Sequence, residues 1–124
     1  MLFRSLPMRM NEVRFSDVLP VEGYGPGFFR IGGEIREGAV VVLPSGVGPW
    51  GGLDDTGTLL AAAAAIDVLF IGTGAEIAPV PTAFRAALEA AGLGVEVMAS
   101  PPACRTYNVL LSEGRRVGVA LLPV

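Results

Sequence analysis

Residues 67–74 read DVLFIGTG, and this short stretch decides the fold class. An apolar run of this length that ends at a glycine turn is typical of a strand buried inside a sheet. A helix is predicted on each side of it, one over residues 54–65 with Asp54 or Asp55 as its cap, and one over residues 81–92. A buried strand between two helices indicates an α/β protein.

The alternation continues to the C-terminus. Residues 95–98 are predicted to form a strand. Ser100 is a plausible N-cap and Pro101 a first helical residue, so a helix is expected from there to about Glu113. Residues 117–122 form the last predicted strand. Strands that alternate with helices predict a central, mainly parallel sheet.

The first third of the chain is rich in strands. Two adjacent glycines at 32–33 separate the extended runs of residues 28–36, which predicts a hairpin that forms a layer beside the central sheet. The β-branched run at 39–43 predicts a strand that is buried on both faces. Residues 44–53, rich in Gly and Pro around Trp50, are expected to form a loop.

Length and composition indicate one folded domain over residues 1–124, with residues 1–12 as a candidate flexible segment. The apolar fraction is 52% and the charged fraction 17%, which argues against intrinsic disorder. The longest unbroken apolar run ends at Ile66 and is too short to cross a membrane, and residues 1–10 lack the apolar block of a secretory signal. We therefore expect no membrane insertion and a cytoplasmic location.

Charge and residue usage exclude several classes of function. All 9 basic residues are arginines spread along a chain of net charge −3, so we expect no nucleic-acid partner. The chain has no histidine, which removes Ser-His and Cys-His catalysis and most zinc sites. Cys104 has no partner for an internal disulfide, which suits a reducing compartment. We assign no catalytic residue, no metal ligand and no cofactor, and leave open whether any reaction is catalysed.

The predicted helix after Ser100 carries the most informative polar residues. Arg105, Asn108 and Ser112 are spaced three and four residues apart and share one face. Free N–H groups at the helix start, together with Arg105, would favour an anion, and Asn108 is a further candidate for holding it. In the alternative interpretation, Arg105 forms a structural ion pair with Glu76, Glu89 or Glu113, which is the commoner arrangement.

The turn Gly72-Thr73-Gly74 also allows two interpretations. Glycines directly after a buried strand let a ligand approach the backbone at the edge where open α/β sheets bind ligands. The turn lacks the third glycine of a dinucleotide motif and the lysine of a phosphate loop. A tight turn without a ligand is the simpler explanation.

Three further side chains are candidates for chemistry or binding. Cys104 lies near a helix start beside Arg105, which would lower its pKa, but a buried cysteine that acts as a small apolar residue is commoner. Tyr107 is either a core ring or a proton donor. Trp50 is a candidate anchor for a protein partner if exposed, or a ring that lies on the core.

Residues 98–111 read MASPPACRTYNVLL, and Glu-Gly-Arg follows at 113–115. This run resembles the signature of a widespread family that includes the mitochondrial complex I assembly factor numbered three and bacterial and archaeal proteins catalogued as a domain of unknown function. The resemblance covers the chain from about Phe15 onward. The most specific positions, here called the family signature, are Arg105, Thr106, Tyr107, Asn108, Glu113, Gly114 and Arg115.

The resemblance implies a three-layer α/β fold with a central mixed sheet. For the mitochondrial member it implies help in building the respiratory NADH dehydrogenase through protein–protein contacts rather than catalysis.

Two hypotheses follow. The preferred one is a non-enzymatic binding or assembly module, which assists complex I biogenesis through contacts with complex I subunits or other proteins. The alternative is a protein that binds a small molecule or anion, conceivably an enzyme, with its site between Gly72-Thr73-Gly74 and Arg105. The high apolar content of the chain is also compatible with a homodimer.

Overall fold

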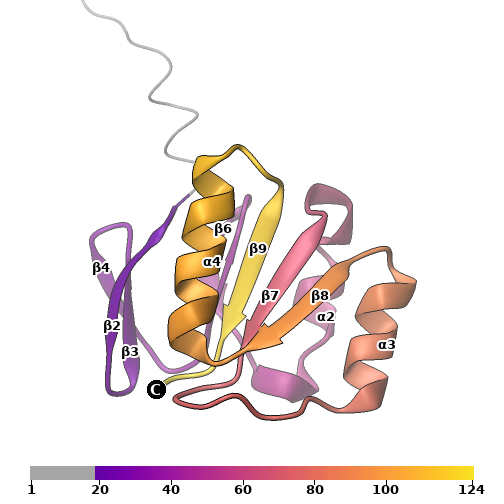
Figure 1. Cartoon of the computed structure of the whole chain (residues 1–124), viewed down its shortest axis with the longest axis horizontal. Coiled ribbons are helices and arrows are strands. Elements are labelled where there is room, and N and C mark those ends of the chain that lie inside the picture. Colours follow the sequence, from indigo (N-terminus) through magenta and orange to yellow (C-terminus); the bar gives the residue numbers. More distant parts are fainter. Residues whose placement is uncertain (1–18) are drawn as a thin grey trace, which may run out of the picture.

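The structure, a computed structural model, describes residues 19–124. These residues form two sheets and flanking helices (Figure 1). The candidate flexible segment, residues 1–12, lies outside the described residues.

The main sheet has five strands in the spatial order β6-β5-β9-β7-β8. They are β5 (Val40–Leu43), β6 (Gly46–Pro49), β7 (Val68–Gly72), β8 (Gly94–Met98) and β9 (Val117–Leu121). β7 pairs in parallel with both β8 and β9, whereas β5 pairs antiparallel with β9 and β6. Because β6 thereby runs the same way as β9, β5 alone opposes the other strands. The predicted mixed, mainly parallel central sheet is confirmed.

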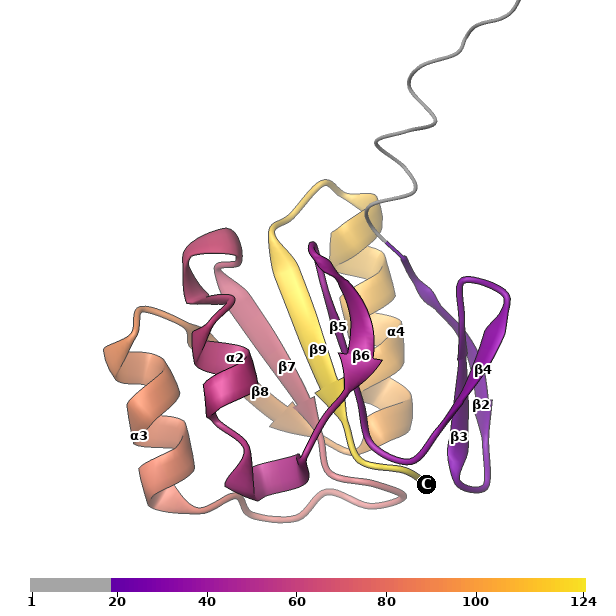
Figure 2. The ribbon, with the colours of Figure 1, turned by 180° about the vertical axis from the view of Figure 1, so that it is seen from behind.

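Both faces of the main sheet are covered, which gives three layers. The 3₁₀ turns η1 (Gly52–Asp54) and η2 (Ala63–Ala65) and the helices α2 (Gly57–Leu60) and α3 (Thr82–Ala90) belong to one outer layer, and α4 (Ser100–Ser112) to the other (Figure 2). Alternate residues of β5 face opposite layers: Val40 and Val42 pack toward α4, and Val41 and Leu43 toward α2 and α3. All four are buried, as the sequence predicted for this strand.

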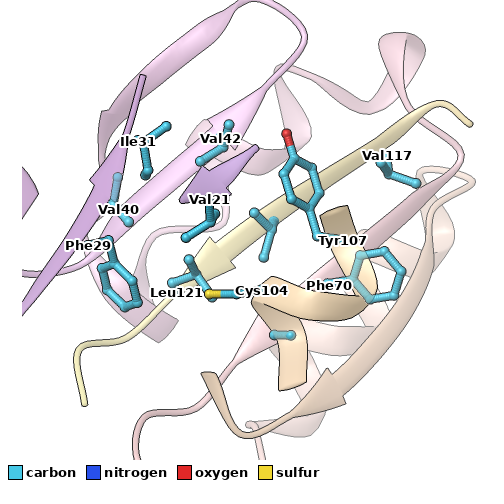
Figure 3. Packing of buried hydrophobic residues seen from close by; sticks show 12 residues of the cluster. Val21, Phe29, Ile31, Val40, Val42, Phe70, Cys104, Tyr107, Val117 and Leu121 are labelled. Atoms are coloured by element: carbon cyan, nitrogen blue, oxygen red, sulfur yellow. The ribbon is translucent and has the colours of Figure 1, made fainter. Parts of the chain in front are cut away.

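The small sheet lies beside α4 and is an antiparallel meander. Its strands are β2 (Val21–Gly25), β3 (Phe28–Ile31) and β4 (Glu34–Glu37). The predicted hairpin glycines, Gly32 and Gly33, have φ angles of 61° and 80°, as a tight turn with left-handed residues requires. Val21, Phe29 and Ile31 turn inward and join Cys104 and Tyr107 of α4 in one cluster (Figure 3).

Two predictions about residues 44–65 are wrong. Residues 46–49 form β6, which pairs with β5 through a turn at Pro44 and Ser45, rather than part of a loop. The helix expected over 54–65 is broken into η1, α2 and η2. Ala62 donates to the Leu59 carbonyl and Ala65 to the Ala62 carbonyl, which are 3₁₀ bonds. So short an alanine run has little helix stability of its own, and the burial of Leu59 and Ile66 sets its path.

Candidate functional site

Ser100, the first residue of α4, occupies the place where the sequence suggested a ligand. Its hydroxyl donates to the Leu122 carbonyl at 2.6 Å and accepts the Gly74 N–H at 2.9 Å. Its own N–H donates to the Gly74 carbonyl at 2.7 Å. The side chain is fully buried. The prediction that Ser100 caps α4 is therefore wrong: Ala99 holds the N-cap position, and Ser100 ties the start of α4 to the ends of β7 and β9.

Gly72 is a glycine because Ser100 lies against it. A Cβ atom at Gly72 would lie 2.7 Å from the Ser100 hydroxyl oxygen, 2.8 Å from the Ser100 Cα and 2.7 Å from a methyl carbon of Leu121. Gly72 therefore permits the close approach of Ser100 and Leu121, which belong to the same chain.

Thr73 and Gly74 are also engaged inside the chain. The Thr73 hydroxyl donates to the Glu76 carbonyl at 2.8 Å and accepts the Ala78 N–H at 3.0 Å, which shapes the loop that leads to α3. Gly74 has a φ of 105° and exchanges two hydrogen bonds with Ser100. These contacts agree with the interpretation of residues 72–74 as a tight turn that packs within the chain.

The start of α4 lacks the free donors that an anion site needs. Pro101 and Pro102 have no N–H group. The Ser100 N–H binds Gly74 and the Ala103 N–H binds the Ala99 carbonyl at 3.1 Å. Of the first helical residues, two therefore lack an N–H group, and the N–H of Ser100 is already paired. An anion site between residues 72–74 and Arg105 stays a prediction, and this geometry weighs against it.

Asn108, the other residue predicted to hold the anion, instead joins α4 to the small sheet. Its side-chain oxygen accepts the Val21 N–H at 2.9 Å, and its side-chain nitrogen donates to the Val21 carbonyl at 2.8 Å. The amide thereby pairs with the edge of β2 as a neighbouring strand would. The Tyr107 hydroxyl adds a bond to the Leu19 carbonyl at 2.9 Å. Two residues of the family signature therefore hold the small sheet in place.

The last part of the signature ends α4. Gly114 has a φ of 80°, and its N–H donates to the Leu111 carbonyl at 3.0 Å. The Arg115 N–H donates to the Leu110 carbonyl at 3.0 Å. These two bonds form a Schellman motif, in which glycine is favoured because the residue must be left-handed. Gly114 thus has a structural role, whereas the side chains of Glu113 and Arg115 are exposed.

Arg105 differs from its neighbours in the signature. It is exposed, and among residues 19–124 it forms no ion pair, so none of the predicted pairs with Glu76, Glu89 or Glu113 is present. Within the part of the chain that the structure describes, no structural role accounts for this arginine. It is accessible to a binding partner.

Cys104 and Tyr107 are poorly suited to chemistry at neutral pH. Burial raises the pKa of the Cys104 thiol to about 11, and this effect outweighs the neighbouring Arg105 charge. Burial likewise raises the pKa of Tyr107 well above its ordinary value. The interpretation of both residues as core side chains agrees with their exposures of 4% and 1%.

Trp50 is buried, with 5% of its surface exposed, which agrees with the alternative in which its ring lies on the core. Its indole N–H donates to the Asp55 carbonyl at 3.0 Å, and its ring centroid lies 6.3 Å from that of Phe84. The ring packs in the same buried cluster as Leu59, Phe84 and Leu88. Direct contact of Trp50 with a partner stays a prediction that its burial weighs against.

Two shallow grooves lie elsewhere on the described surface. One runs between β4 and the β5–β6 hairpin, beside Ile35, Arg36 and Pro49. The other lies between the loop at 77–80, the start of α3 and Val97 on β8. Neither is lined by Gly72, Thr73, Gly74 or Arg105. Residues 19–124 contain no cluster of three potential metal ligands and no helix long and apolar enough to cross a membrane.

The family described as "protein of unknown function (DUF498/DUF598)" matches residues 21–122, which include both sheets and all of α4. The chain belongs to the DUF498/DUF598 family. The resemblance inferred from the signature around Arg105 is confirmed.

Two similar sequences are an uncharacterised bacterial protein and a vertebrate assembly factor. An uncharacterised protein of Rhodobacter capsulatus is 48% identical over 117 residues, which cover 94% of each chain. The NADH dehydrogenase [ubiquinone] 1 alpha subcomplex assembly factor 3 of Danio rerio is 31% identical over 128 residues, covering 98% of this chain and 74% of that protein.

Solved structures share the fold. An outer membrane protein from Bartonella henselae has a TM-score of 0.78 at 32% identity, covering 85% of this chain and 94% of that one. The Mth938-like domain of Bordetella pertussis has a TM-score of 0.71 at 29% identity, covering 99% and 92% of the two chains. Solved bacterial structures at about 30% identity thus share the overall fold of this chain.

Proposed function

We propose that this protein is a non-enzymatic binding module that assists the assembly of respiratory NADH dehydrogenase through protein–protein contacts. One observation carries the proposal: the similarity to the zebrafish assembly factor extends over 98% of this chain rather than over one motif. We place this activity in the cytoplasm, with subunits of the enzyme as the partners.

The geometry of the described residues supports binding over catalysis. The nucleophile and the proton donor considered from the sequence, Cys104 and Tyr107, are buried with raised pKa values. The Gly72 carbonyl, the Thr73 N–H and hydroxyl, and both backbone groups of Gly74 pair within the chain. Both described grooves are shallow and open, whereas small-molecule sites usually enclose most of their ligand.

Within the family signature, Arg105 is the residue that we assign to partner contact. Tyr107, Asn108 and Gly114 have structural roles. Arg105, like Glu113 and Arg115 at the end of α4, is exposed and forms no ion pair with residues 19–124, and of these three it alone belongs to the Arg-Thr-Tyr-Asn run. Arginine is favoured at protein interfaces because its planar group binds carboxylates and backbone carbonyls in fixed geometry.

Affinity capture tests the proposal. The tagged protein is expressed in its own cells, and bound proteins from cytoplasm and membranes are identified by mass spectrometry. We expect enrichment of NADH dehydrogenase subunits, reduced by Arg105→Ala and unchanged by Arg30→Ala, which removes an exposed arginine from β3. A gene deletion should also lower the amount of assembled enzyme. Normal enzyme levels in the deletion strain, with no subunit captured, would contradict the proposal.

A homodimer stays a prediction, and sedimentation of the free protein tests it. The anion alternative is tested by titration with inorganic phosphate. Resonance shifts at Thr73, Gly74 and Arg105 would favour it over the assembly proposal.

A further inference from the structure

β8 is an edge strand of the main sheet, and part of its backbone is unpaired. The Gly94 N–H donates to the Asp67 carbonyl at 2.9 Å, and the Met98 carbonyl accepts the Thr73 N–H at 2.9 Å. In a parallel pair, residues alternate between facing the neighbour strand and facing away. Gly94, Glu96 and Met98 therefore face β7, and the backbone groups of Val95 and Val97 point outward.

The two outward-facing residues differ in their protection. The Val95 carbonyl accepts a hydrogen bond from Nη2 of Arg85 at 3.0 Å, and Glu89 holds that arginine at 3.1 Å. Val97 has no such cover: within residues 19–124 its N–H and carbonyl have no protein partner. An extended segment can pair with an edge of this kind.

A groove adjoins the open part of β8. It is lined by the loop residues Ile77, Ala78, Pro79 and Val80, by Thr82 and Arg85 of α3, and by Val97 of β8. Ile77 is 66% exposed, the highest value among the large apolar residues of the described part. Figure 1 shows β8 at the outer side of the sheet with α3 beside it. A strand added to β8 would place an apolar side chain opposite Val97 in this groove, because side chains on one face of a sheet are neighbours.

The negative charge of Glu96, on the other face of β8, favours a basic partner segment. Glu96 points away from the groove because its neighbours Val95 and Val97 belong to the opposite face, and it is exposed. Neither Glu96 nor Glu76 forms an ion pair within residues 19–124. Opposite charges on paired strands are stabilising, and like charges directly opposite are destabilising. A second copy of β8 that paired about Glu96 would oppose two carboxylates, whereas a basic strand would neutralise one.

We propose that the open edge of β8 at Val97, together with the Ile77–Val80 groove, binds an extended segment of a partner protein in which apolar residues alternate with basic ones. The apolar residues occupy the groove and the basic residues lie beside Glu96. This inference rests on the proposed function in one respect: the chain acts by binding a protein.

Titration with two matched synthetic peptides, followed by NMR, tests the inference. One short peptide alternates valine with arginine, and the other has glutamate in place of each arginine. The basic peptide should shift the resonances of residues 95–98 and 77–80 and slow hydrogen exchange of the Val97 N–H. Its Kd should be roughly threefold to tenfold lower than that of the acidic peptide. Equal affinities, or shifts confined to other surfaces, would overturn the proposal.

Two variants of β8 and one control refine the test. Glu96→Lys should reverse the order of the two affinities, while the same charge change on β4, Glu37→Lys, should leave it unchanged. Val97→Pro removes the outward N–H at a position where an edge strand tolerates proline, and should abolish binding of both peptides. If Val97→Pro does not fold, the reversed order of peptide affinities in Glu96→Lys still tests the proposal. An unreversed order would overturn the proposal.

Two further outcomes are separable from these. Shifts at residues 95–98 on dilution of the free protein would assign the edge to a second copy and overturn the proposal. Capture of NADH dehydrogenase subunits does not involve the peptides, so a failed capture contradicts the proposed function and leaves the peptide result standing. Loss of that capture in Glu96→Lys, but not in Glu37→Lys, would connect the two.

Discussion

The main sheet and the small sheet are stabilised in different ways. Every residue of β5 and β9 is buried, and helices cover both faces of the main sheet. The small sheet buries one face on α4, while Tyr24 and Ile35 on it stay 45% and 49% exposed. The larger apolar area removed from water makes the main sheet the more stable part.

The small sheet depends more on particular polar contacts. Asn108 pairs with both backbone groups of Val21, and Tyr107 binds the Leu19 carbonyl. At its other end, the Gly27 N–H donates to the Val124 carbonyl at 3.0 Å. Each contact joins residues far apart in the sequence. The comparison shows that signature residues on α4 position the small sheet, which is stabilised less by burial than the main sheet is.

The largest expected effect is in the main sheet. Leu69→Ala removes a fully buried side chain of β7 and should lower the free energy of unfolding by about 3 kcal/mol. Chemical denaturation should show both sheets unfolding together, because α4 packs on both. Ile77→Ala, at an exposed site, serves as the control and should change the free energy by less than about 0.5 kcal/mol. Unfolding of the small sheet alone in Leu69→Ala would contradict the comparison.

A smaller effect on stability is expected at Gly72, where the ends of β7 and β9 contact the start of α4. Gly72→Ala places a Cβ within 2.8 Å of Ser100 and Leu121, so it should cost about 2 kcal/mol of unfolding free energy. The matched control is Gly57→Ala, whose added Cβ would come no closer than 3.9 Å to any neighbour. Thermal unfolding measures both. Equal melting temperatures for the two variants would show that Ser100 does not fill this position.

Asn108→Ala sharpens the comparison by acting on the small sheet. It leaves the Val21 N–H and carbonyl without partners and should cost about 1–2 kcal/mol. Hydrogen exchange should accelerate at residues 21–37 and stay unchanged in β7. The Cys104 thiol lies under the small sheet, so its reaction with a thiol reagent should also accelerate.

The control for Asn108→Ala is Val109→Ala, which alters the neighbouring exposed residue of the same helix. If Val109→Ala opened the small sheet as much as Asn108→Ala, the amide pairing would not be what holds it.

The smallest effect on stability depends on pH and concerns Asp55, whose carbonyl accepts the Trp50 indole N–H. Hydrogen bonds from the Thr58 N–H, the Gly51 N–H and the Thr58 hydroxyl lower the pKa of Asp55 from 3.8. A lowered pKa stabilises the fold above the unfolded value and loses this contribution as the pH falls through the folded value. Asp55→Asn should therefore be less stable than wild type at pH 7, and the gap should close below pH 3.8. Denaturation at a series of pH values measures the gap, and a gap that widens in acid would contradict this.

Much of the fold could be predicted from local sequence patterns. The alternation of apolar runs and helix signals after residue 67 gave β7, α3, β8, α4 and β9 in order, because each element carries its own periodicity and boundary residues. β6 was missed because its residues, GVGP, have weak strand propensity, and its pairing with β5 comes from tertiary structure. The two-residue turn Pro44-Ser45 was the available signal.

The candidate site was less predictable than the fold. The sequence placed Arg105 and Asn108 on one helix face, but the partner of Asn108 is Val21, 87 residues away. A side chain's partner across such a separation depends on how the layers pack. Similarly, the serine expected to cap α4 instead binds Gly74 and Leu122.

The sequence by itself determined the α/β class, the buried strands and membership of the DUF498/DUF598 family, since periodicity and motif are local properties. Tertiary structure decided that Trp50 is buried, that Ser100 fills the space beside Gly72, and that the backbone of Val97 on β8 has no partner among residues 19–124. The physical reason is that burial and hydrogen-bond pairing depend on which distant segments meet, and a local pattern does not contain that information.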